Sequence, residues 1–281
     1  MKTTITSKSK AEVIFQSVGD SLFQVLQYNN IAGYTSYKRF KQIKDIYANN
    51  DSLRQIKVIL KNSTIKIQSE ILSYMKGDIG IKDKKIKSSS ITRRLLGIGE
   101  KTGKISLSGT GEVYFKPSFK YFSLIELDDE EIVIDEDIFY ICEDSIKINI
   151  EDGENLLDKD KLQIKLRGSG IVILLMQVPE DEIIRCKLFN DKLIVDGEFA
   201  VLRSGSIDVS IESINNNFNH SDISEKEYLH VYEGIGEVWI LPTLSCYEDF
   251  SEDINEKQEQ ENSITSLYRA KVIKLYWKKL I

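Results

Sequence analysis

The strongest constraint on the fold is a motif of two glycines separated by one residue, which occurs three times. The copies are Gly109 with Gly111, Gly168 with Gly170, and Gly234 with Gly236. Each copy follows an alternating strand pattern and leads into strand-forming residues such as Val113-Tyr114-Phe115. A motif that returns in this way predicts one supersecondary unit that is used repeatedly and stacked to bury a shared core.

A second part of the repeat lies between the glycine pairs. Residues 131–150 align without gaps on residues 192–211, and nearly every apolar position of one segment is apolar in the other. Asp135 then corresponds to Asp196, at turn positions where a carboxylate is expected to cap backbone N–H groups. The sequence therefore predicts an all-β fold made of repeated β units.

The glycine pairs have a structural and a chemical interpretation. Glycines between strands allow positive φ and a tight hairpin or bulge. A phosphate cradle would need a helix that opens directly after the glycines, and strand formers follow here. The segment from Gly97 to Lys104 also lacks the spacing of a P-loop. We therefore expect all six glycines of the three pairs to be structural turn residues.

From Ile56 onward the sequence reads as one short strand after another. The turn signals between the strands are Asn62-Ser63, Lys76-Gly77-Asp78, Asp128-Asp129 and Asn190-Asp191. Short strands with frequent turns are typical of a sandwich or a barrel-like fold. Upstream, apolar residues from Tyr37 to Tyr47 recur at helical spacing among lysines and an arginine. They predict a short amphipathic helix that either packs on a sheet or touches a membrane surface.

Charge divides the chain into a basic and an acidic part. Residues 1–104 carry 20 Lys and Arg against 8 Asp and Glu, whereas residues 105–281 carry 18 against 36. The basic excess suggests an anion-binding patch, with the members Lys82, Lys84, Lys85, Lys87, Arg93 and Arg94. The other interpretation is that this stretch lies against acidic strands of the same chain or of a neighbouring subunit. The net charge of −6 argues against general nucleic-acid binding.

The end of the chain combines an acidic linker with a basic aromatic segment. Residues 248–261 carry seven acids and one lysine, and residues 264–281 mix apolar, aromatic and basic side chains. This segment either binds a membrane surface or a partner groove, or folds back on the body. Its candidate partner-binding residues are Arg269, Lys271, Lys274, Trp277, Lys278 and Lys279. We therefore expect three regions: 1–54 with strands and a helix, 55–247 with the repeats, and 248–281.

Composition and motifs give little support for a metal site, a cofactor or an enzyme. The three cysteines form no CxxC spacing, which favours a reducing compartment, and the chain has only two histidines. Neither histidine lies in a motif that pairs it with a nucleophile, and most acids fall at turns where they protect sheet edges. No apolar stretch is long enough to span a bilayer, and no leader is expected. We expect a cytoplasmic protein that is not an enzyme and carries no metal or cofactor.

Four segments together resemble the altered-inheritance-of-mitochondria (mitochondrial biogenesis) family, over roughly residues 55 to 243. They are Met75 to Ile79, Arg93 to Glu100, Gly109 to Ile150 and Gly234 to Ile240. The resemblance implies a pseudo-symmetric fold like the double-stranded β-helix of the tryptophan–RNA attenuator class, assembled as a ring or trimer. It implies no catalytic residues. In eukaryotes, members of the family are mitochondrial and linked to the inner membrane.

The function that these features favour is a non-enzymatic β-scaffold. We expect it to form a homo-oligomer and to bind a protein partner, or to lie peripherally on a membrane. A small-ligand or RNA-binding oligomeric ring is the alternative, suggested by the fold analogy. Exposed aromatic stacking positions near Tyr114 or Trp239 would favour the ring.

Overall fold

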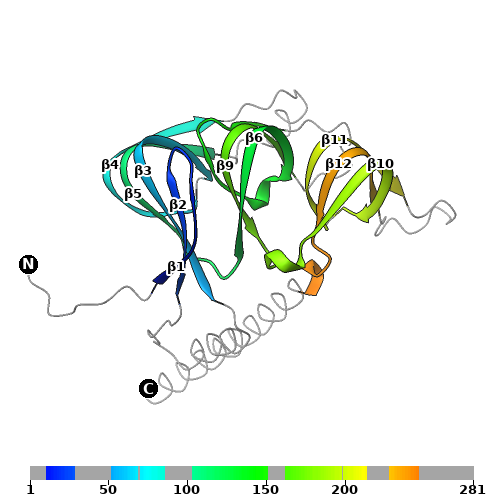
Figure 1. The fold of residues 1–281 in the computed structure, drawn as a ribbon, viewed down its shortest axis with the longest axis horizontal. Coiled ribbons are helices and arrows are strands. Elements are labelled where there is room, and N and C mark those ends of the chain that lie inside the picture. The colour runs from blue at the N-terminus through cyan, green and yellow to red at the C-terminus, as the bar shows by residue number, and fades with distance from the viewer. Residues whose placement is uncertain are drawn as a thin grey trace, which may run out of the picture. The chain divides into compact units, whose positions relative to one another are not determined.

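The computed structural model describes residues 11–28, 52–68, 70–85, 103–150, 162–197, 199–213 and 228–246. The described chain is nearly all β and forms one 12-stranded sheet in which every pairing is antiparallel (Figure 1). The chain divides into two compact units, Met1–Leu241 and Pro242–Ile281. All twelve strands belong to the first unit. This confirms the all-β prediction.

Most strands of the repeated part are long, and the shortest strands, β7 and β8, belong to it as well. Their bounds are β1 Ala11–Val18, β2 Leu22–Tyr28, β3 Leu53–Gln68, β4 Leu72–Lys85, β5 Gly103–Phe115, β6 Tyr121–Asp135, β7 Phe139–Glu143, β8 Lys147–Ile150, β9 Gln163–Met176, β10 Ile184–Asp196, β11 Ala200–Ser213 and β12 Tyr228–Ile240. Two single-turn 3₁₀ helices, η1 Glu136–Ile138 and η2 Glu180–Glu182, lie between strands.

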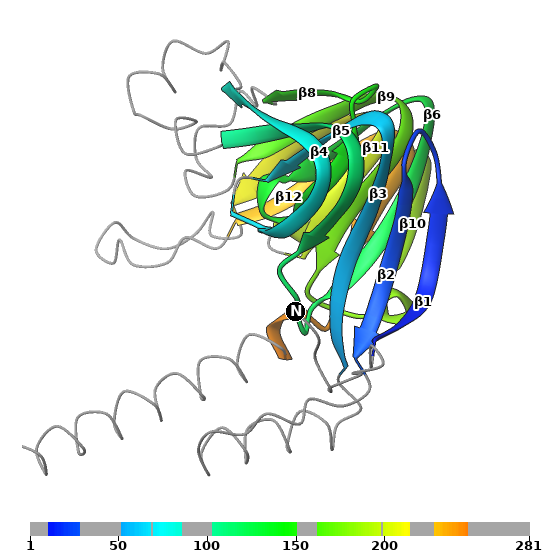
Figure 2. The ribbon, with the colours of Figure 1, turned by 90° about the vertical axis from the view of Figure 1, so that its left-hand side faces the viewer.

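The strand pairing has the same pattern three times. Each strand that carries a glycine pair is the middle one of its group. In the first repeat β5 lies between β3 and β4, as Figure 2 shows. In the second repeat β9 lies between β6 and the two short strands β7 and β8. In the third repeat β12 lies between β10 and β11. The strand with the glycine pair is therefore the last strand of each repeat along the chain. The other strands of the first repeat, β3 and β4, lie upstream of the first pair.

The prediction of short strands separated by turns is wrong for the repeats. The signals at Asn62, Asp129 and Asn190 lie inside β3, β6 and β10, where the register shifts as in a β-bulge. Each of these residues has positive φ, at 55°, 51° and 62°. Asn and Asp tolerate this conformation, so the strand bends without ending. The three strands therefore bend where a turn was expected, and each runs on for 13 to 16 residues.

The core is divided between the repeats. One large cluster of buried apolar side chains runs through β2, β3, β5, β7 and β9, and its fully buried members include Phe23, Ile65 and Phe115. A smaller cluster in the third repeat contains Leu188, Ala200, Tyr232 and Val238. Within the described ranges, the strand pairing between the second and third repeats consists of three residue pairs between β6 and β11. We call this junction the seam.

The N-terminal strands belong to the same sheet as the repeats. As the sequence predicts, strands lie at 11–18 and 22–28, and β2 pairs with β3 over Leu22 to Tyr28. The helix predicted around Tyr37 to Tyr47 and the segment 264–281 lie outside the described residues. No helix in the described part of the chain has the length and apolarity that a bilayer span requires.

Candidate functional site

The glycine pairs mark the bends of β5, β9 and β12, within continuous strands and not between strands as we expected. Gly109 has a φ of +140°, and a Cβ added there would lie 2.0 Å from the carbonyl oxygen of Asp78. Glycine is required because both the conformation and the close approach of β4 exclude a side chain. Equivalent contacts recur in the other repeats: Gly168 against Ser145 at 2.7 Å, and Gly234 against Ser206 at 2.2 Å.

In two of the three glycine pairs, the residue between the glycines carries a hydroxyl group that accepts a hydrogen bond from the bulge on the neighbouring strand. The backbone N–H of Asn62 donates to Thr110 Oγ1 at 3.0 Å. In the same way, the N–H of Asp129 donates to Ser169 Oγ at 2.9 Å. The third repeat departs from this pattern because Ile235 stands between its glycines. There Ile235 is 52% exposed and pairs in register with Phe189, which is 73% exposed.

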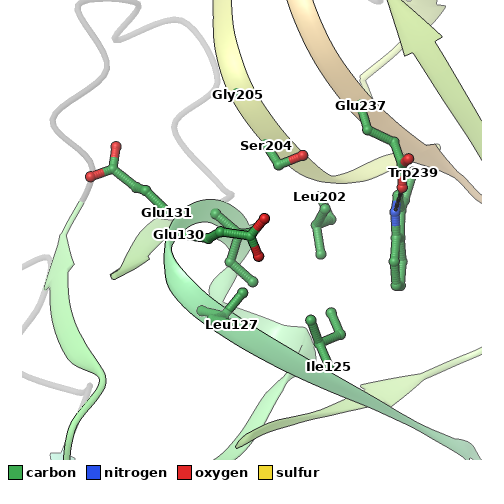
Figure 3. A pocket seen from close by; sticks show the side chains of 10 residues that line it. Ile125, Leu127, Glu130, Glu131, Leu202, Ser204, Gly205, Glu237 and Trp239 are labelled. Atoms are coloured by element: carbon green, nitrogen blue, oxygen red, sulfur yellow. Dashed lines mark hydrogen bonds between the residues drawn. The ribbon is translucent and has the colours of Figure 1, made fainter. Parts of the chain in front are cut away.

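A cavity of about 480 Å³ lies beside the seam, lined by parts of β6, β11 and β12 (Figure 3). Its apolar lining consists of Ile125, Leu127, Ile132, Leu202 and the Trp239 ring. Three carboxylates, those of Glu130, Glu131 and Glu237, and the Ser204 hydroxyl complete the wall together with Gly205. The cavity exists because β6 and β11 pair over three residues and then diverge.

The carboxylates of the cavity are held differently. Glu237 accepts a hydrogen bond from Trp239 Nε1 at 2.6 Å, and Glu131 forms an ion pair with Lys165 at 3.1 Å. In Figure 3 the carboxylate of Glu130 points toward the middle of the cavity, whereas that of Glu131 points away from it. The Glu130 side chain has no hydrogen bond or ion pair with any residue that the structure describes. It is therefore the available anionic group of this site.

A second polar cluster lies across β3, β5 and β4, at the aromatic position near Tyr114. Tyr74 and Tyr114 stack with their ring centroids 4.5 Å apart, and Tyr74 is 54% exposed. The ammonium group of Lys57 lies 5.2 Å from the Tyr114 ring centroid and 2.7 Å from a carboxylate oxygen of Glu112. The cluster is an exposed aromatic platform with a cation beside it.

Mutual contacts shift the pKa values in this cluster. The hydrogen bond from Lys57 holds the pKa of Glu112 below its ordinary value. Burial alone lowers the pKa of Lys57, but its interactions with Glu112 and Tyr114 outweigh burial and raise that pKa. Burial, and next the neighbouring Tyr114, raise the pKa of Tyr74. The phenol is therefore neutral at physiological pH, while Lys57 and Glu112 are both charged.

A buried carboxylate that the sequence did not reveal connects the N-terminal hairpin to the second repeat. Glu143 ends β7 and is 2% exposed. It accepts hydrogen bonds from the backbone N–H of Ser21 at 3.2 Å and of Ile171 at 2.9 Å. It fits only because Gly19 and Gly170 have no side chain, since a Cβ at either would lie within 2.9 Å of Glu143 oxygens. Gly170 was recognisable in the sequence as part of a glycine pair, but Gly19 and the common partner were not.

The remaining predicted site residues are only partly described. Lys82 is exposed on β4, and the backbones of Lys84 and Lys85 end that strand. The other members of the basic patch and the whole partner-binding set lie outside the described residues. Asp135 precedes η1, where its side chain makes no cap; its carboxylate instead accepts a hydrogen bond from Gln163. In the described ranges, no His, Cys, Asp or Glu side chains gather in a group that could hold a metal ion.

Comparisons with known proteins agree with this architecture. The model of the mitochondrial biogenesis AIM24 family matches residues 47–243, which include all three glycine pairs. The crystal structure of a Streptococcus pyogenes protein is similar at a TM-score of 0.55 and 15% identity, covering 73% of this chain and 94% of that one. At this identity the likeness concerns the fold alone. No protein of curated function matches the sequence. Since the family model covers well over half of the chain, this protein belongs to the mitochondrial biogenesis AIM24 family.

Proposed function

We propose that this protein is a non-enzymatic β-scaffold that self-associates in the cytoplasm and presents its termini to a protein or membrane-surface partner. The observation that carries the proposal is the position of the exposed large apolar side chains. Most of them lie on strands whose outer edge pairs with no described strand. They are Val13, Ile14, Phe15 and Val18 of β1, Tyr74 and Ile81 of β4, and Ile184, Phe189 and Ile194 of β10.

The strands β1 and β10 end the sheet on opposite sides. An edge strand presents unpaired N–H and C=O groups, and soluble proteins commonly protect such edges with charged side chains. On β1, four of the eight side chains are exposed and apolar, and Glu12 is its only charged residue. An edge of this kind is stabilised when a strand of another copy extends the sheet and buries these side chains.

Pairing of β1 in one copy with β10 in the next would be head-to-tail, and such contacts generate closed rings when the rotation closes. The three repeats of one chain support the finer proposal of a pseudo-symmetric fold like the double-stranded β-helix of the tryptophan–RNA attenuator class. In that assembly each subunit would contribute both of its sheet edges to interfaces.

Light scattering coupled to gel filtration tests the self-association. We expect the full chain to elute as an oligomer and Phe15→Lys to shift it toward the monomer. The matched control is Gln16→Lys, which adds the same charge at an exposed polar position of the same strand. Phe189→Lys on β10 is expected to act like Phe15→Lys. A wild-type chain that stays monomeric at high micromolar concentration would contradict the proposal.

The segment 264–281 is the proposed partner contact, because it combines basic and aromatic side chains behind an acidic linker. A cross-linked pull-down should compare the full chain with one truncated after Tyr247. We expect specific proteins or lipids to be lost on truncation. Unchanged partners would place the partner site on the β body.

The alternative function is a small-ligand or RNA-binding oligomeric ring, and the platform of Tyr74 and Tyr114 beside Lys57 supports its RNA-binding form. Exposed aromatic rings stack on bases, and nearby cations contact phosphates. A salt-dependent RNA shift that vanishes when Lys82, Lys84, Lys85 and Lys87 become Glu would favour the ring over the scaffold.

A further inference from the structure

We infer that the cavity beside the seam is a binding site for a small organic cation with an apolar body, such as an arylalkylamine. This goes beyond the scaffold role, because it assigns a ligand to the monomer. The inference rests on the size of the cavity, its apolar lining, and the sign and availability of the charge that faces it.

The cavity has the dimensions and lining of a small-molecule site. At about 480 Å³ it lies within the range of ligand pockets, roughly 300 to 1,000 Å³. Leu127, Ile132 and Leu202 are buried, and Trp239 is only 6% exposed. The carboxylates and the Ser204 hydroxyl form the polar part of the wall, and these apolar side chains form the surface that the body of a ligand would meet. Such a surface binds the body of a ligand through burial and not through hydrogen bonds.

The charge of the lining selects a cation. Among the ten lining residues in the described ranges, three are acidic and none is basic. Of the cations on the adjacent strand β10, Arg185 pairs with Glu180 and lies over the Trp239 ring, with its guanidinium carbon 4.4 Å from the ring centroid. Lys192 pairs with Glu212, Lys187 is exposed, and none of the three lines the cavity. Glu131 is matched by Lys165, and Glu237 is oriented by the Trp239 N–H. Glu130 is left to meet the ligand's ammonium group.

In Figure 3 the Glu130 carboxylate lies beside the apolar lining of the cavity. The Glu130 carboxylate faces Leu202 and the Ser204 hydroxyl, so an ammonium group beside it would have an acceptor on each side. The apolar body would then extend over Leu127 and Leu202 toward Trp239. An anion of the same shape would meet carboxylates, and a neutral analogue would gain only the apolar contact.

Fluorescence of Trp239 provides a direct test. In a Trp277→Phe background, Trp239 is the sole tryptophan of the chain. Three probes of equal body are titrated: phenethylamine, phenethyl alcohol and phenylacetate. We expect the amine to bind roughly fivefold more tightly than the alcohol, as one partly exposed ion pair contributes up to about 1 kcal/mol. We expect phenylacetate to bind most weakly.

Two variants then assign the effect to Glu130. Glu130→Gln should remove the preference for the amine and leave the affinity for the alcohol unchanged. Glu131→Gln is the matched control, since its carboxylate points away and is already paired with Lys165, and it should keep the preference. The inference is overturned if the three probes bind equally, if none binds at millimolar concentration, or if both variants lose the preference alike.

Discussion

The stability of the fold depends strongly on single glycines at the three bends, because the backbones of two neighbouring strands lie within contact distance there. Gly109 meets Asp78, and Gly234 meets Ser206, in the same arrangement. The conformation and the close approach act together, so neither can relax without moving a strand. Stability at these positions therefore depends on the absence of a side chain.

Gly109→Ala is expected to lower the free energy of unfolding by more than about 2 kcal/mol, since a Cβ at φ +140° would clash with a carbonyl oxygen 2.0 Å away. Gly80→Ala on β4 is the matched control. Its added Cβ would lie 3.8 Å from the nearest atom, an ordinary contact. Urea unfolding of both variants measures the difference, and equal losses would contradict this account.

Glu143→Gln should lower stability by about 1–3 kcal/mol, because two buried N–H groups lose a charged acceptor. Glu126→Gln, an exposed carboxylate on β6, serves as the control and should be near neutral. The amide protons of Ser21 and Ile171 should exchange faster in Glu143→Gln alone. Unchanged exchange would show that the carboxylate does not hold the hairpin.

The ion pair of Lys57 and Glu112 predicts a pH dependence. The pKa of Glu112 is lowered from 4.5 in the fold, so its contribution is present above that value and lost as the pH falls through the folded pKa. The pKa of Lys57 is raised, so its contribution is lost only as the pH rises through that higher pKa. Glu112→Gln should therefore cost stability at pH 7, by less than about 1 kcal/mol, and cost less at pH 2. Chemical denaturation at the two pH values tests this; an equal cost at both would contradict it.

At the scale of the strand, each bend joins a bulge on one strand to a glycine pair on the next. Thr110 and Ser169 accept from the bulge N–H groups, and Ile235 cannot. The third bend is thus held by strand pairing and by a local bond from the Phe189 N–H to Asp191 Oδ1 at 2.6 Å. The first two bends have a cross-strand bond in addition.

Thr110→Val should consequently cost about 0.5–1.5 kcal/mol, because the N–H of Asn62 loses its acceptor. Ile235→Thr makes the third bend resemble the others and should change stability by less than about 0.5 kcal/mol. Thermal unfolding of both variants measures these effects. The reverse order of costs would contradict the role of the hydroxyl.

The elements were partly predictable from the sequence. The glycine pairs and the alignment of 131–150 on 192–211 revealed the repeat. The same backbone conformation and the same burial recur in each copy, and they require the same types of residue. The turn signals misled, because Asn62 and Asp129 satisfy a bulge by the same positive φ that a hairpin would need. Only the register across strands distinguishes the two, and register depends on partners distant in the sequence.

For the whole molecule, the seam separates a small third core from a large shared one. Proteins open in cooperative units whose stability follows the apolar surface that they bury. Native-state hydrogen exchange should therefore show β10, β11 and β12 opening together at a lower free energy than β3, β5 and β9. Uniform protection across all three repeats would contradict this division.

The cavity beside the seam could not be predicted for the same reason. Trp239 was recognisable as an aromatic position, but Glu130 and Ser204 carry no motif, and they meet Trp239 only because β6 and β11 pair briefly and diverge. Glu143 is a similar case, since its partners lie 122 and 28 residues away in the chain. Local patterns specify strands and bends, whereas these sites depend on the order of strands in the sheet.

The bends also determine which substitutions the protein can accept. Asn62, Asp129 and Asn190 are exposed, and burial alone would mark them as freely replaceable. Their backbone conformation makes them as restrictive as core positions, with glycine as the favoured substitute. A saturation mutagenesis map of this protein would therefore show three narrow bands of intolerance on its surface, one for each repeat, that solvent accessibility does not explain.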